Sequence, residues 1–114
     1  MATKRSVGAV LTTSLTNIYE VPANKRAEWV LVYITNTSGS NETFNLTYYK
    51  ASTATALAIL DGKTLSAKDV FQIGGPYNEF IMMEAGDKIQ ASASASATIL
   101  VSVIEQNATA VRNN

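Results

Sequence analysis

Apolar and polar residues alternate with a period of two along much of the chain. Between Thr43 and Tyr48 every second residue is Phe, Leu or Tyr, and the residues between them are Thr or Asn. From Lys88 to Ser96, Ile and Ala alternate in the same way with polar side chains. Successive side chains of a strand point to opposite faces, so this period indicates half-buried strands. Because no segment sustains a period of 3.6, we predict an all-β protein.

Turn-forming sequences separate the strands at short, regular intervals. They are VPANK (21–25), NTSGSN (36–41), DGK (61–63), GGPYN (74–78) and EAGD (84–87). This spacing favours a sandwich or small barrel, and we predict a single antiparallel β-sandwich, jelly-roll-like, with eight or nine short strands. Only KASTATALAIL (50–60) could compete as a helical turn, because alanine favours helix. The expected strands are 7–13, 16–21, 27–36, 42–50, 55–60, 65–73, 78–84, 87–93 and 97–105.

Alanine and serine alternate without a break over residues 91–96. Alanines on the inward face would let two sheets approach closely, and serines on the outward face would keep the strand hydrated. A flexible Ser/Ala linker is the alternative, but the run lies between a charged turn and a hydrophobic strand. We expect a turn at 94–96 and then a closing strand with Ile99, Val101 and Val103 inward.

Two segments carry apolar side chains on both faces of a strand. In WVLVYI (29–34), Trp, Leu and Tyr share one face and the β-branched residues share the other, and FIMM (80–83) has the same character. One face belongs in the core, and the other lies either under a loop or arm of the same chain or in a subunit interface, where aromatic residues and Met are enriched. The candidate interface residues are Val30, Val32, Ile34, Ile81 and Met83. The residues expected to be largely buried are Trp29, Leu31, Phe44, Leu46, Ile89, Ile99, Val101 and Val103.

Size and charge narrow the classes of function. The 114 residues suffice for one domain with a modest core, which we place at 7–105, between an N-terminal arm (1–6) and a polar tail (106–114). Nine Lys and Arg balance nine Asp and Glu, so no net charge favours nucleic acid or an anionic membrane as a partner. No apolar run reaches the length of a membrane span or forms a leader peptide, so we expect a chain used without secretion by a leader.

Cysteine and histidine are both absent. Their absence removes thiol chemistry, the usual general base and the commonest transition-metal ligand. Glu84 and Asp87 flank Ala-Gly, which indicates a tight turn in preference to a catalytic pair or a calcium site, and the glycines of 74–76 mark a loop, not a phosphate site. We therefore predict no enzymatic activity, cofactor or metal. The Asn-x-Ser/Thr sequons, attributed to the Asn- and Thr-rich composition, are at Asn36, Asn41, Asn45 and Asn107.

Aromatic side chains offer one further chemistry, a platform for binding sugars. The candidates are Trp29, Tyr33, Tyr48, Tyr49 and Tyr77. The strand that carries Trp29 is too apolar to face solvent, and the pair Tyr48-Tyr49 places one ring on each face. Tyr49 and Tyr77 are therefore the residues that we expect to be exposed and able to stack on a carbohydrate.

Two stretches carry a resemblance that together spans residues 18–106. The first, IYEVPANKRAEWVLVYITNTSGSNETFNLTYYKAS, contains Tyr-x-Val-Pro, a polar turn, a hydrophobic strand and Asn-Thr-Ser before a second strand. The second, FIMMEAGDKIQASASASATILVSVIEQ, contains a strand followed by Gly-Asp, a short strand of small residues and a last strand ending in Glu. In this order they resemble small β-sandwich accessory structural proteins of tailed bacteriophages.

The resemblance implies a virion component without an active site. The function we expect is a capsid decoration or cement protein that stabilises the particle; a tail-associated adaptor, or a fibre module that binds a receptor carbohydrate, is the alternative. The resemblance also implies a homo-oligomer, a trimer, with major capsid or tail proteins as partners, assembled in the host cytoplasm and resident in the virion. The shared positions are turn formers and core residues, so no functional residue is carried over.

Overall fold

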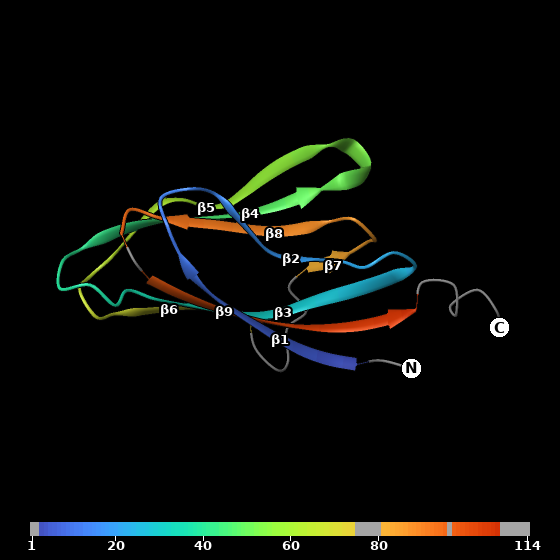
Figure 1. Ribbon diagram of the computed structural model, residues 1–114, viewed down its shortest axis with the longest axis horizontal. Coiled ribbons are helices and arrows are strands. Elements are labelled where there is room, and N and C mark those ends of the chain that lie inside the picture. The colour runs from blue at the N-terminus through green and yellow to red at the C-terminus, as the bar shows by residue number, and fades with distance from the viewer. Residues whose placement is uncertain (1–2, 75–80, 96, 108–114) are drawn as a thin grey trace.

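Two antiparallel sheets pack face to face in the computed structural model, which describes residues 3–74, 81–95 and 97–107 (Figure 1). The predicted all-β sandwich is therefore confirmed. A single 3₁₀ turn, η1 (Ala51–Thr53), joins the fourth and fifth strands where the alanine-rich sequence could compete as helix. The strands are β1 (Thr3–Leu11), β2 (Thr16–Glu20), β3 (Lys25–Thr35), β4 (Glu42–Lys50), β5 (Thr55–Leu65), β6 (Val70–Gly74), β7 (Ile81–Met83), β8 (Lys88–Ala93) and β9 (Ala97–Asn107).

The order of the strands in the two sheets is that of a jelly roll. Sheet A has the order β1-β9-β3-β6, with β7 also paired to β3, and sheet B has the order β2-β8-β4-β5. β6 pairs with Leu31–Thr35 and β7 with Ala27–Trp29, so the two short strands follow one another along the same side of β3. Because β6 and β7 share one position beside β3, the nine strands occupy eight positions. Strands from the two ends of the chain, such as β1 and β9, lie side by side, as two Greek keys require.

The core fills the space between the sheets and consists mainly of the residues that the alternation predicts. Phe44, Leu46 and Tyr48 project inward from β4, and the closing strand β9 contributes every second residue. On β8 the alanines Ala91 and Ala93 are buried, which confirms that they face inward. The predicted core residues that are buried are Trp29, Phe44, Leu46, Ile89, Ile99, Val101 and Val103.

One extra residue in β3 changes which of its side chains face inward. Trp29 pairs with Val103 and Leu31 with Ser102, so the register against β9 slips by one residue at Val30. This is a β-bulge, and it reverses the faces of every residue that follows it. Val32 and Ile34 are consequently buried with Trp29, whereas Leu31, which the alternation places in the core, lies on the outside and is only half-buried.

A second irregularity replaces a predicted turn. The DGK sequence at 61–63 lies within β5, which continues to Leu65 without turning. Register shifts against β4 occur near this point, and Gly62 has a φ of 72°, so the glycine accommodates a bulge in the edge strand. The reversal of the chain comes later, at residues 66–69, where the Asp69 N–H donates to the Ser66 carbonyl.

Several strand boundaries, among them those of β3, β6 and β7, and the exposure of one strand face also differ from the pattern. β1 begins at Thr3, so residues 3–6, expected to form an arm, pair with β9. β9 extends to Asn107, two residues into the expected tail. On β8 the serine face is only partly exposed: Ser94 is exposed, but Ser92 is buried and accepts a hydrogen bond of 3.2 Å from the Asn45 amide.

The tight inner face of β8 gives a first prediction. Replacing the fully buried Ala91 with Leu adds volume where the sheets already touch, and overpacking of this kind typically costs about 2 kcal/mol. Ala58→Leu, on the exposed part of β5, is the matched control and should change the free energy of unfolding by less than about 0.5 kcal/mol. Urea unfolding of both variants tests this, and equal effects would contradict the close packing at Ala91.

Candidate interaction surfaces

Two buried tyrosines lie in one row on the inner face of sheet B. Tyr19 on β2 and Tyr48 on β4 pair with Ile89 on β8 from either side. Each tyrosine donates its hydroxyl hydrogen to a buried carboxylate, Tyr19 to Glu105 and Tyr48 to Asp87. Among the described residues, these two pairs are the buried groups with ionisable side chains that an active site could use. Their other contacts show whether they are free to react.

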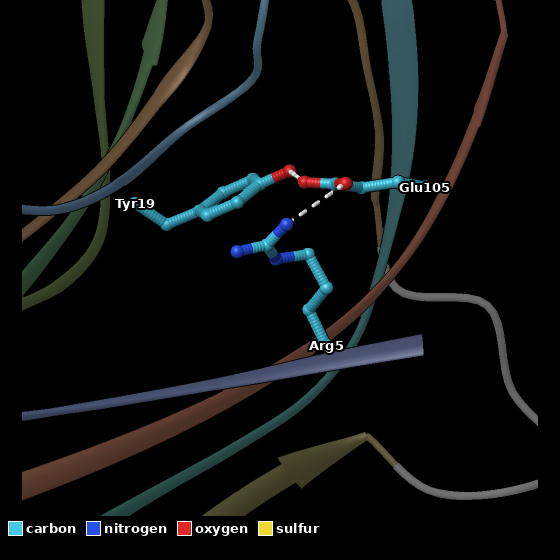
Figure 2. A network of polar contacts seen from close by, with 3 residues as sticks. All are labelled: Arg5, Tyr19 and Glu105. Atoms are coloured by element: carbon cyan, nitrogen blue, oxygen red, sulfur yellow. Dashed lines mark hydrogen bonds and ion pairs between the residues drawn. The ribbon is translucent and has the colours of Figure 1, made fainter. Parts of the chain in front are cut away.

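The first pair spans the two sheets. Tyr19 projects from sheet B, and its hydroxyl donates to Glu105 Oε2 on β9 of sheet A, as Figure 2 shows. The Arg5 guanidinium approaches from β1, with Nη1 3.6 Å from Glu105 Oε1. Burial and the hydrogen bond to Glu105 raise the pKa of Tyr19 well above its ordinary range. A hydroxyl that stays protonated and points at a paired carboxylate acts as a brace between sheets, not as a general base.

The second pair holds a turn. Asp87 accepts hydrogen bonds from the Tyr48 hydroxyl (2.5 Å) and from the backbone N–H groups of Ala51 (2.9 Å) and Glu84 (3.0 Å). The Asp87 N–H in turn donates to the Glu84 carbonyl, and Gly86 supplies a positive φ. The interpretation of Glu84–Asp87 as a tight turn is therefore confirmed, and the turn also fixes the start of η1.

The sequence pattern did not identify a third buried polar group, Asn36. Its side-chain nitrogen donates to the carbonyls of Ser40, Leu65 and Ser66, and its oxygen accepts from the Ser38 N–H. Asn36 thus ties the β3–β4 and β5–β6 connections together, although its sequon suggests a surface position. The sequence could have identified Asn36 by its position, directly after a hydrophobic strand and at the start of a polar turn. At such positions Asn side chains form hydrogen bonds with nearby backbone groups.

The aromatic candidates for sugar binding do not form one surface. Trp29 and Tyr48 are buried, and Tyr33 and Tyr49 lie on different sheets. Tyr49 is half-buried, and the Lys88 ammonium lies 5.2 Å from the centre of its ring, where it covers one face. Tyr77 lies outside the described residues. Among the residues that are described, no stacking platform brings these rings together.

The residues proposed as a subunit interface are mostly inside the sandwich. Val32, Ile34 and Met83 are fully buried, and Ile81 packs against the same core from β7. Val30 is half-buried at the bulge. The physical reason is the face reversal in β3, which carries Val32 and Ile34 inward, together with the pairing that aligns Ile81 and Met83 with Trp29 and Ala27.

The apolar surface lies instead on the outward-facing side of sheet A, here called the outer face. After the bulge, Leu31 and Tyr33 belong to this face, alongside Leu100 and Ile104 of β9. Solitary exposed apolar residues need no explanation, whereas several apolar residues on one sheet face are typical of a surface that contacts another molecule. The most exposed members are Val10 (62%), Val70 (52%), Leu100 (43%) and Met82 (40%).

A second exposed apolar segment is the free edge of β5. This strand is the last in sheet B, and the residues from Thr55 to Ala58 are exposed, with Leu57 at 46%. The hairpin of β4 and β5 lies at the top of Figure 1, on the side away from sheet A. Near the other end of β5, the Lys63 ammonium lies 5.5 Å from the Phe71 ring of sheet A and closes that side of the sandwich.

No protein-family model matches the chain, and no curated protein matches it. Within the described part of the chain, no helix is long and apolar enough to cross a membrane. The same residues contain no cluster of three or more acidic side chains that could hold a metal ion. The outer face of sheet A and the free edge of β5 are therefore the surfaces from which a function is inferred.

The hydrogen bonds to Asp87 give a prediction that depends on pH. Burial alone would raise the pKa of Asp87, but the hydrogen bonds from Tyr48 and two backbone N–H groups outweigh it and lower the pKa below 3.8. The ionised carboxylate therefore stabilises the fold at neutral pH, and this stabilisation is lost as the pH falls through 3.8 and then through the lower pKa of the folded state.

Asp87→Asn should consequently lower the free energy of unfolding by about 2 kcal/mol near neutral pH, because hydrogen bonds to a charged group are lost. The difference between the variant and the parent protein should shrink in acid. Urea titrations at several pH values measure it. Asp61→Asn, at an exposed position of β5, is the control and should show neither effect; a constant difference at all pH values would contradict the assignment.

Proposed function

We propose that the chain is a non-enzymatic structural protein of a bacteriophage virion that decorates the capsid and stabilises the particle. The proposal combines the resemblance over residues 18–106 with the character of the surface. Its buried tyrosines and carboxylates are occupied in bonds that hold the sandwich together, as Tyr19–Glu105 and Tyr48–Asp87 illustrate. The described residues thus offer surfaces for contact and no group poised to react.

The observation that carries the proposal is the free edge of β5. An unpaired edge strand exposes a row of N–H and C=O groups to which another chain can add a strand, and soluble proteins usually protect such edges with charges, prolines or covering loops. In β5 the sequence TALAIL (55–60) leaves the edge apolar, and charged residues appear only from Asp61 onward. An edge of this kind is a liability for a free monomer but an attachment point for a protein that works within an assembly.

The alternative function, a tail-bound adaptor or receptor-binding module, has weaker support. Sugar binding needs an open aromatic face, and the Tyr49 ring already has Lys88 over one of its faces. The connections between strands that are described contain mainly Ser, Thr, Gly and Asn, which offer little apolar area to a ligand. A broad contact with capsid subunits through strand edges agrees better with this surface.

Particle binding tests the proposal. Purified protein should sediment with capsids that lack it and should raise the temperature at which those capsids open. Leu57→Lys should reduce binding at least about tenfold, because a lysine on an edge strand disfavours strand addition and must be desolvated in the contact. Thr13→Lys, in the exposed bend between β1 and β2, adds the same charge and should leave binding unchanged.

Two results would count against capsid decoration. Equal binding by the Leu57 and Thr13 variants would remove the role of the β5 edge. Electron microscopy that places only a few copies at the tail of the particle would favour the adaptor function, and absence of the chain from purified particles would remove the virion role altogether.

A further inference from the structure

We propose that two copies of this chain pair face to face through the outer face of sheet A, about a two-fold axis that runs along β9. The proposal uses a surface separate from the β5 edge, so it stands or falls independently of capsid binding. Three features of the outer face support a second copy as the occupant: the placement of Lys4 and Glu28, the placement of Gly8, and the apolar side chains of Leu100 and Ile104 along the axis.

The sheet register places complementary residues at equal distances from β9. β9 lies between β1 and β3, and one row across these strands reads Lys4, Ile104 and Glu28. A two-fold axis along β9 exchanges the flanking strands, so β1 of each copy lies over β3 of the other. Interfaces with this symmetry use the same patch twice and must be complementary to themselves.

Lys4 and Glu28, two of the charged residues on the outer face, satisfy this condition; Arg26 projects from the same face beside Glu28 and lies outside the exchanged pair. In the pair, Lys4 of one copy faces the partner's Glu28, and its own Glu28 faces the partner's Lys4. Neither residue forms an ion pair with another described residue, so both charges are available. Facing sheets are rotated by about 30° relative to each other, and the long side chains of Lys and Glu can span the offset that this rotation produces. The pairing therefore gains two intermolecular ion pairs.

Beyond the row of Ser6, Ser102 and Leu31, the shapes match in the following outward row toward the β1–β2 end. That row reads Gly8, Leu100 and Tyr33, so the partner's Tyr33 lies over Gly8. Gly8 has no side chain, and a Cβ built there would meet only the Ile99 carbonyl oxygen at 3.6 Å and Leu100 Cδ1 at 3.8 Å. The space beside Leu100 is therefore open to the ring of Tyr33, whose hydroxyl can remain at the wet rim.

Two of the outward-facing residues of β9, on either side of Ser102, bring apolar side chains to the axis. Leu100 and Ile104 both project outward from β9, and each would contact its own counterpart in the second copy. Val70 and Met82, on the far side of β3, would reach past the free edge of the partner's β1. Burial of these side chains supplies the driving force, and the ion pairs fix the direction of the pairing.

The area of contact sets the expected strength. Three strands about 4.8 Å apart and about 30 Å long give roughly 430 Å² from each copy, or about 860 Å² in all. This lies at the low end of specific interfaces, below about 1,200 Å². We therefore expect a dimer that forms at micromolar concentration, in place of the trimer that the resemblance implies.

Charge reversal tests the pairing. By sedimentation equilibrium, Lys4→Glu and Glu28→Lys should each raise the dissociation constant of the dimer about tenfold or more, because each places two like-charged pairs in the contact. The double variant Lys4→Glu with Glu28→Lys restores opposite charges and should return the constant to within about threefold of the parent value. Asp61→Lys changes the net charge as Glu28→Lys does, but lies on β5, and should have no effect.

A second variant tests the axis. Leu100→Lys brings two ammonium groups together where the parent protein has two leucines, so it should abolish dimerisation. The circular dichroism spectrum should stay unchanged, since Leu100 is 43% exposed in the single chain.

A parent protein that is monomeric at high micromolar concentration, or trimeric, would overturn the proposal. Failure of the double variant to recover would overturn it as well. A dimer that does not bind capsids would leave the pairing intact and remove only the proposed function.

Discussion

The single extra residue in β3 is the constraint on which the rest of the structure depends. β3 is the strand that pairs with β9 along its whole length and with β6 and β7 on its other side, so it organises sheet A. The bulge at Val30 lets Trp29 and Val32 both enter the core although they are three positions apart. The same shift turns Leu31 and Tyr33 outward, where they join the apolar residues of β9. One local irregularity thus determines both the content of the core and the character of the outer face.

Polar bonds close the two ends of this apolar sandwich. At one end Tyr19 and Tyr48 reach Glu105 and Asp87, and at the other the two N–H groups of the Asn36 amide lie within hydrogen-bond distance of carbonyls in neighbouring connections. A buried polar group that loses its partner costs about 1–3 kcal/mol, so these networks disfavour any alternative arrangement in which their members separate. The apolar core tolerates several arrangements, because one apolar contact can replace another. The hydrogen-bond networks favour a single arrangement, because each donor needs its own acceptor.

The alternation of residues predicted the sandwich and most of its core because the period of two is clear in β4 and β8, and because every second residue of β9 from Ala97 to Val103 is apolar and buried. It assigned the wrong faces in β3 because Val30 resembles any other strand residue, and only the pairing with β9 shows that it is extra. It placed a turn at residues 61–63 because Asp-Gly is usual in turns and also in bulges. The bond between Tyr19 and Glu105 joins residues 86 positions apart and follows only from the topology.

The pairing of β1 with β9 also determines when the fold can be completed. Among the described strands, β1 has no other neighbour in sheet A and β2 pairs in sheet B with β8, so these two strands wait for strands that come much later in the chain. Strands that are distant in the sequence can pair only after the long chain segment between them has closed into a loop, which costs conformational entropy. Folding is therefore slow, on the order of milliseconds to seconds for sandwiches of this kind. During synthesis the strands of the nascent chain remain open to the wrong partners.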